Sequence, residues 1–188
     1  VSGNPFGAIT LNTKQAVREY LTIDELKLLI DTPTKFSVRK PFLFSCFTGL
    51  RWSDVTALRW SDVEEYGGRT RIRFRQKKTS EYTIMDINEQ AVSLMGERGE
   101  DDALIFNCKK ICACNLQLGK WTKSAGIKKH ITFHCARHTF ATMMLTLGAD
   151  LYVVSKLLGH SDISTTQIYA KIVDKRKQEA VDLIPQML

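Results

Sequence analysis

Arginine, histidine and tyrosine residues recur in three short segments of this sequence, in an order suited to phosphate chemistry. Arg51 follows a Thr-Gly-Leu run. His134 and Arg137 are three residues apart, so one helix face would carry both. His160 follows a Leu-Leu-Gly run, and Tyr169 comes nine residues later. A guanidinium has a planar fork that meets two phosphate oxygens at once, so these segments predict a site for a phosphodiester.

Cleavage of a phosphodiester without a metal ion requires cations on the phosphate oxygens, a nucleophile and a proton donor for the leaving oxygen. Tyr169 suits the second task if the DNA is to be rejoined, because a phosphotyrosine keeps the bond energy and needs no nucleotide cofactor. A phenol with a pKa of about 10 is a weak nucleophile. Nearby guanidinium charge and a histidine acceptor would activate it.

Each of these residues also has a structural interpretation. Arg51 suits a helix cap at the surface, His134 a helix start and His160 a loop after a helix end. A lone Tyr169 is more often a packed aromatic, and Tyr152 is a rival nucleophile within the preceding helix. Their occurrence together, in this order, favours the catalytic interpretation.

Alternating and helical patterns predict the elements that position these residues. Residues 69–76 alternate strictly, with arginine at 69, 71, 73 and 75, and residues 82–87 form the returning strand of a hairpin. The arginine stripe suits either a solvated face or phosphate contacts. The expected fold is mainly α with a small antiparallel β-sheet (α+β). The expected helices cover residues 23–30, 36–47, 53–58, 89–95, 115–125, 133–147, 150–159 and one from 164 past Tyr169.

Composition favours a protein that binds a polyanion. The formal net charge is +7, and residues 103–188 carry 12 Lys and Arg against 5 Asp and Glu, so this half holds the whole excess. We expect neither a secretory signal nor a membrane helix, and a cytoplasmic location. The five cysteines are expected to be reduced, and their spacing fits no common zinc pattern: Cys46, Cys108, Cys112, Cys114 and Cys135.

The three segments resemble the tyrosine recombinase or phage integrase family over about residues 20–175, and are most similar to integrases of conjugative transposons and related bacterial mobile elements. The resemblance implies that Arg51 and Arg137 bind the scissile phosphate and that His160 hydrogen-bonds one of its oxygens. His134 would accept the proton of Tyr169, which attacks phosphorus and leaves a 3′-phosphotyrosyl link and a free 5′ hydroxyl.

The resemblance also implies a lysine on the hairpin that protonates the leaving oxygen. The family's Gln-x-Lys-Thr pattern selects Lys78, with Lys77 as the rival, and Asp54 falls where an acid often supports the first arginine. The chain departs from the family at Cys135-Ala136, usually Asp-Leu, and at Met85-Asp86, often Pro-Leu. His138 either extends the site or, as we expect, packs or supports Arg137.

The expected organisation is a linker (1–19), a catalytic domain (20–173) and a C-terminal tail helix (174–188). Two placements of this tail are open: folding onto its own domain or, as the resemblance implies and we favour, docking on a neighbouring protomer. The resemblance implies site-specific recombination of double-stranded DNA by a tetramer, without metal or ATP cofactors, and possible DNA-bending accessory proteins. It also implies a bacterial protein that is associated with the nucleoid. The alternatives are a type IB topoisomerase-like enzyme, which relaxes DNA without strand exchange, and an accessory DNA-binding protein that has lost catalysis.

Overall fold

Nine helical segments and three strands form the part of the chain that the structure describes, which is residues 18–77, 82–108 and 110–181 of a computed structural model. The helices are α1 (Ile23–Asp31), α2 (Arg39–Thr48), α3 (Trp52–Val55), the 3₁₀ helix η1 (Trp60–Asp62), α4 (Glu89–Met95), α5 (Ile111–Ser124), α6 (His134–Thr146), α7 (Leu151–Leu157) and α8 (Ser164–Val181). The antiparallel sheet has the order β1 (Val63–Tyr66), β2 (Arg69–Arg75) and β3 (Tyr82–Asp86). This confirms the predicted fold class.

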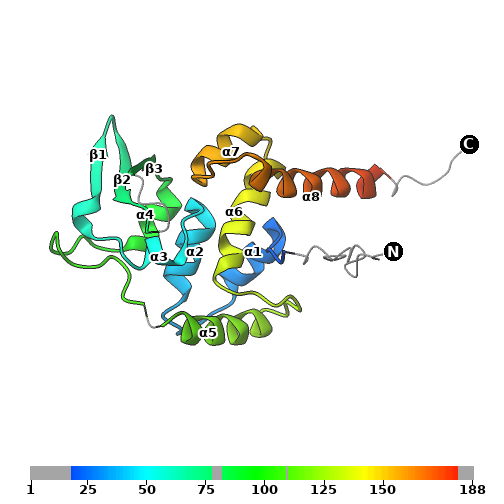
Figure 1. The fold of residues 1–188 in the computed structure, drawn as a ribbon. Helices are drawn as coiled ribbons and strands as arrows, with labels where there is room; N and C mark the ends of the chain where they lie inside the picture. The colour runs from blue at the N-terminus through cyan, green and yellow to red at the C-terminus, as the bar shows by residue number, and fades with distance from the viewer. Residues whose placement is uncertain (1–17, 78–81, 109, 182–188) are drawn as a thin grey trace, which may run out of the picture.

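Helix α6 runs through the middle of the molecule and connects its two halves (Figure 1). On one side it packs against α2, which also packs against α4. On the other side it packs against α8 and α7, while the sheet lies at the far end from α8 (Figure 1). A side chain on α6 can therefore meet partners from both halves.

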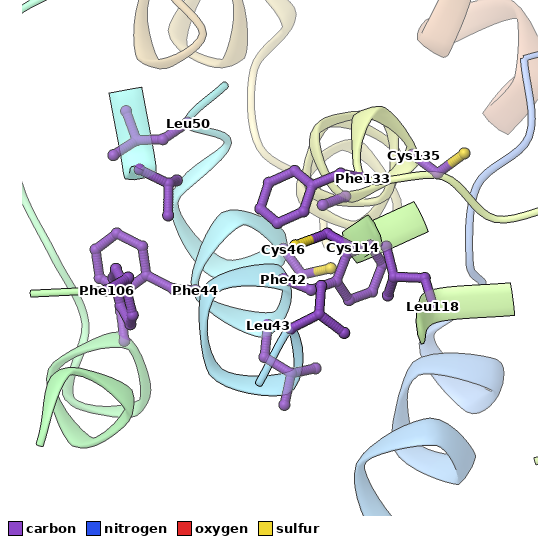
Figure 2. Packing of buried hydrophobic residues seen from close by; sticks show 14 of the residues in the cluster. Phe42, Leu43, Phe44, Cys46, Leu50, Phe106, Cys114, Leu118, Phe133 and Cys135 are labelled. Atoms are coloured by element: carbon purple, nitrogen blue, oxygen red, sulfur yellow. The ribbon is translucent and has the colours of Figure 1, made fainter. Parts of the chain in front are cut away.

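The main core gathers around α2 and the start of α6 (Figure 2). The Phe42 ring meets Phe133 edge-on at 5.8 Å and Trp121 at 6.4 Å between ring centroids. A second, smaller cluster joins α6, α7 and α8 through Phe140, Val154 and Tyr169. The predicted nucleophile thus belongs to the smaller cluster, whereas α2 and α5 pack in the larger one.

Most helix ends follow the capping signals of the sequence. Thr22 and Glu25 form a capping box at α1, and the Asp150 carboxylate accepts two backbone N–H groups at the start of α7. Gly49 ends α2 in the left-handed region, with φ 72°. The helix expected over residues 53–58 begins one residue earlier, at Trp52, and Arg51 is its N-cap, without a side-chain capping bond.

Strand β1 was missed, and two other boundaries differ. Its Val-Glu-Glu-Tyr sequence has no apolar alternation, and the strand depends on pairing with β2 across the Gly67-Gly68 turn, where both φ angles are positive. Helix α5 begins four residues before its predicted start. The expected tail is not a separate helix where it is described, because residues 174–181 continue α8. Residues 182–188 lie outside the described part.

Candidate active site

One face of α6 carries three of the polar side chains at the centre of the site. His134, Arg137 and His138 have the i, i+3 and i+4 spacing of helical neighbours. His134 is exposed at the helix start, whereas Arg137 and His138 are buried. The two histidine rings meet edge-on with centroids 4.5 Å apart. A single helix therefore presents two imidazoles and a guanidinium side by side.

Arg137 is held by the ends of two other helices. Its Nη1 donates to the Gly49 carbonyl at 2.8 Å and its Nη2 donates to the Leu158 carbonyl at 2.5 Å. Burial, with the nearby charge of Arg51, lowers its pKa to about 10, partly offset by Tyr169 and Asp54. It therefore remains a cation at neutral pH, in a position fixed by α2 and α7.

Arg51 shares a hollow of about 220 Å³ with two residues of α6. Its Nη1 donates to the Gln76 side-chain oxygen at 2.9 Å, at the end of β2. The predicted residues Arg51, His134 and Arg137 therefore come together, although 82 residues lie between the first and the second. The lining comprises Leu50, Arg51, Trp52, Ser53, Ile111, Phe133, His134 and Arg137.

The hairpin after β2 approaches the same region. Lys78 lies outside the described residues, but the backbone N–H of its neighbour Lys77 donates to the Asp54 carboxylate at 2.9 Å. Asp54 is buried, so it fixes the base of the hairpin tip next to α3. The sequence suggested that Asp54 supports the first arginine; its carboxylate accepts hydrogen bonds from Lys77 and from Ser53.

Gln76 connects several residues of the site, a role that the sequence analysis did not assign. Its buried amide accepts from Arg51 and donates to the Thr83 hydroxyl at 2.7 Å. It also lies against Gly159, where a Cβ would come 2.5 Å from the Gln76 Nε2. The signal was present in the Gln-x-Lys-Thr pattern, of which only the lysine was considered.

His160 stands just after the glycine turn that ends α7. It is half-buried, and its Nδ1 contacts the Thr166 hydroxyl at 2.7 Å, at the start of α8. The His160 backbone N–H bonds to the Ser155 carbonyl at 3.0 Å, which closes the turn. His160 therefore lies at the junction of α7 and α8, two residues beyond the Leu158 carbonyl that holds Arg137.

Tyr169 is buried in α8, and its hydroxyl contacts the Nδ1 of His138 at 2.6 Å. Burial raises the pKa of the phenol, while Arg137 and a hydrogen bond from the Arg18 side chain act against the rise. Burial and the charges of His134, Arg18, Arg137 and His160 lower the pKa of His138 to about 3. His138 was expected to pack or to support Arg137; it is buried, and its hydrogen-bonded partner, which the sequence did not identify, is Tyr169.

Three other features of the described residues bear on metal binding, cysteine chemistry and membrane spans. No group of three or more His, Cys, Asp or Glu side chains there is arranged to hold a metal ion. The five cysteines are free thiols, and burial raises the pKa of Cys108 to about 12. No helix of the described part is long and apolar enough to cross a bilayer.

Comparison with known proteins adds independent information. The sequence pattern of the phage integrase family matches residues 19–176. A tyrosine recombinase of Pseudothermotoga lettingae is 48% identical over 67 residues, which are 36% of this chain and 23% of that protein. The chain thus spans about a quarter of the length of that curated relative.

Solved structures share the fold. XerH site-specific recombinase, bound to palindromic difH substrate in a post-cleavage complex, has a TM-score of 0.71 at 22% identity, covering 88% of this chain and 53% of that chain. The catalytic domain of bacteriophage HP1 integrase has a TM-score of 0.62 at 22% identity, covering 89% of this chain and 95% of that chain. The second match extends over nearly all of a single domain.

Proposed function

Because this chain belongs to the phage integrase family, we propose that it is the catalytic domain of a site-specific DNA recombinase that cuts and rejoins DNA through Tyr169. The observation that carries the proposal is the convergence on α6. Arg51, His134 and Arg137 line one hollow, and the Tyr169 hydroxyl contacts His138 on the same helix. The HP1 integrase catalytic domain, with a similar fold, supports this assignment.

The phosphate would be bound by side chains from three separate helix ends. Arg51 at the start of α3 and Arg137 on α6 supply positive charge, and each guanidinium has five N–H groups. Two of those of Arg137 bind carbonyls, which leaves the others for phosphate oxygens. His160 would donate a further hydrogen bond. These cations would stabilise the charge that develops on phosphorus in the transition state.

In the chemical step the Tyr169 oxygen forms a bond to phosphorus while the bond from phosphorus to the DNA 5′ oxygen breaks. The phenolic proton passes to His134, and Lys78 protonates the leaving 5′ oxygen. The product is a 3′-phosphotyrosyl link, and the reverse reaction rejoins the strand. These chemical steps require neither a metal ion nor ATP.

Double-stranded DNA is the proposed partner, together with further copies of the same protein. The excess of basic residues in the C-terminal half supports the first, and the DNA-bound XerH structure supports it by likeness of fold. Several expectations from the sequence remain predictions. They are the tetramer, the docking of residues 174–188 on a neighbour, the domain limits 20–173, the accessory proteins, the nucleoid location and the likeness to conjugative-transposon integrases.

A suicide substrate tests the proposal. The protein is incubated with nicked duplexes of randomised crossover sequence, and covalent adducts are resolved on a denaturing gel. We expect an adduct with the unmodified protein, with or without EDTA, and none with Tyr169→Phe. Tyr152→Phe is the matched control, because Tyr152 is 58% exposed on α7 and should not affect the adduct. An adduct that survives Tyr169→Phe would contradict the assignment, and plasmid relaxation without strand exchange would favour a topoisomerase.

The hairpin lysine is tested with a bridging sulfur at the leaving 5′ position. A thiolate leaves without protonation, so the substrate bypasses a general acid. We expect Lys78→Ala to lose cleavage of ordinary DNA and to regain it on the sulfur substrate, whereas Lys77→Ala retains both. The opposite pattern would assign the role to Lys77.

A further inference from the structure

The contact between Tyr169 and His138 joins the nucleophile directly to α6. The hydroxyl and the Nδ1 are 2.6 Å apart, and the ring centroids are 5.6 Å apart. Tyr169 is 2% exposed and His138 is 5% exposed, so water cannot easily replace either partner. A buried polar contact of this length restricts the phenol to one orientation.

The protonation states fix the direction of this hydrogen bond. The pKa of His138 is lowered to about 3, so its imidazole is neutral at pH 7. The pKa of Tyr169 is raised by burial, so its phenol keeps the proton. Tyr169 therefore donates to Nδ1, and the ring proton of His138 resides on Nε2. An imidazole with so low a pKa is too weak a base to remove the proton, which leaves that step to His134.

The position of His138 on α6 gives the contact a mechanical consequence. Arg137, one residue earlier on the same helix, is fixed by the Gly49 and Leu158 carbonyls. The Tyr169 hydroxyl is thus tied to the helix that would bind the phosphate, rather than only to the packing of α8. Phe140 on α6 and Leu158 after α7 belong to the same buried cluster as Tyr169.

We propose that His138 is a positioning residue that fixes the Tyr169 hydroxyl relative to the phosphate bound by Arg137. This rests on the proposed function, in which Tyr169 is the nucleophile. Displacing a reacting group by about 1 Å can reduce a rate by about 100-fold. Loss of the contact should therefore slow the chemical step without changing the affinity for DNA.

Three substitutions test the role of His138 in the full chain. His138→Leu removes the acceptor, His138→Asn places an amide oxygen near the position of Nδ1, and His138→Gln extends the amide towards Nε2. We expect the single-turnover rate of adduct formation to fall by about 10- to 100-fold in His138→Leu, with unchanged DNA affinity. His138→Asn should regain most of the rate, and His138→Gln should regain less.

A second measurement does not depend on activity. The carbon-13 shift of the Tyr169 ring carbon that bears the hydroxyl, assigned with Tyr169→Phe, reports on the hydrogen bond. We expect it to move in His138→Leu and to return towards the wild-type value in His138→Asn. An unmoved shift in His138→Leu overturns the contact.

The activity outcomes separate this inference from its premise. A wild-type rate in His138→Leu, or a faster one, overturns the positioning role while the proposed function stands. Equal rates for His138→Asn and His138→Leu also overturn it, because packing alone would then explain the loss. Failure of the wild-type protein to form any adduct overturns both the proposed function and the role built on it.

Discussion

The chain gathers arginine in two places, on β2 and at the centre of the site, and the surroundings of each guanidinium differ. On β2 the alternating pattern places Ile72 and Phe74 in the core, while Arg71 and Arg73 face outward. Arg71 pairs with Asp86 at 2.7 Å and Arg73 with Glu64 at 3.1 Å, each from a neighbouring strand. In α6, by contrast, Arg137 is 4% exposed and its nitrogens bind backbone carbonyls.

This difference separates arginines that pair with carboxylates on a sheet from a buried arginine whose nitrogens donate to backbone carbonyls. Hydrogen bonding to Asp86 raises the pKa of Arg71, because the carboxylate stabilises the cation. Burial and Arg51 lower the pKa of Arg137, and no ion pair among the described residues includes it. A buried cation without a carboxylate partner is a place where a phosphate would be favoured. The density of arginine in the sequence does not predict which guanidinium has this property.

The largest expected effect comes from Arg137→Lys. An ammonium is a point charge and cannot bond to the Gly49 and Leu158 carbonyls and to phosphate in the geometry of a fork. We expect the single-turnover rate of adduct formation to fall by more than about 100-fold. Arg73→Lys is the matched control on the sheet and should leave the rate almost unchanged. Similar losses in both variants would remove the distinction between the two arginine groups.

Gly159→Ala should destabilise the buried region around Arg51 and Arg137. Gly159 has φ +62°, and its new Cβ would lie 2.5 Å from the Gln76 amide that holds Arg51. We expect a loss of about 2 kcal/mol in the free energy of unfolding, and a slower adduct rate as Arg51 shifts. Gly68→Ala is the control, with φ +75° and no atom within 4 Å of the added Cβ. It should lose only the backbone part, about 1 kcal/mol, in urea titrations.

Stability should also depend on pH through His138. Its folded pKa of about 3 lies below its ordinary value of 6.5, so the unfolded chain binds the proton more readily. The contribution of the neutral His138 ring to the free energy of unfolding is complete above pH 6.5 and is lost progressively as the pH falls towards 3. Between pH 8 and pH 5.5 the wild-type protein should lose about 1 kcal/mol more than His138→Asn. Parallel urea titrations of the two proteins measure this, and parallel losses would mean that His138 is not buried as a neutral ring.

The smallest effect is expected from Arg73→Gln. The Arg73–Glu64 pair is exposed, and such pairs contribute less than about 1 kcal/mol. The free energy of unfolding should change by less than this, and the adduct rate by less than about threefold. Measuring the DNA affinity of both proteins at increasing salt concentration tests the stripe more directly than the adduct rate does. A clear decrease in the salt dependence would show that the stripe binds phosphate after all.

Local signals in the sequence predicted most elements, and failed where an element depends on a distant partner. The capping box at Thr22 and the alternation of residues 69–75 can be recognised from neighbouring residues alone. Strand β1 cannot, since Glu64 and Glu65 become strand residues only by pairing with Arg71 and Thr70 of β2. Ser53 suited a helix cap, yet α3 begins with Trp52, whose ring packs against Phe133 at 4.8 Å. Tertiary packing there outweighed the local preference.

The sequence by itself determined the family, the order of the candidate residues and the placement of His134, Arg137 and His138 on one face of α6, because a helix repeats at fixed spacing. It did not determine which imidazole meets the tyrosine. The approach of α8 to α6 decided that, bringing the Tyr169 hydroxyl to His138 and leaving His134 exposed at the hollow with Arg51. Contacts between segments distant along the chain are set by packing of whole helices, which local spacing does not encode.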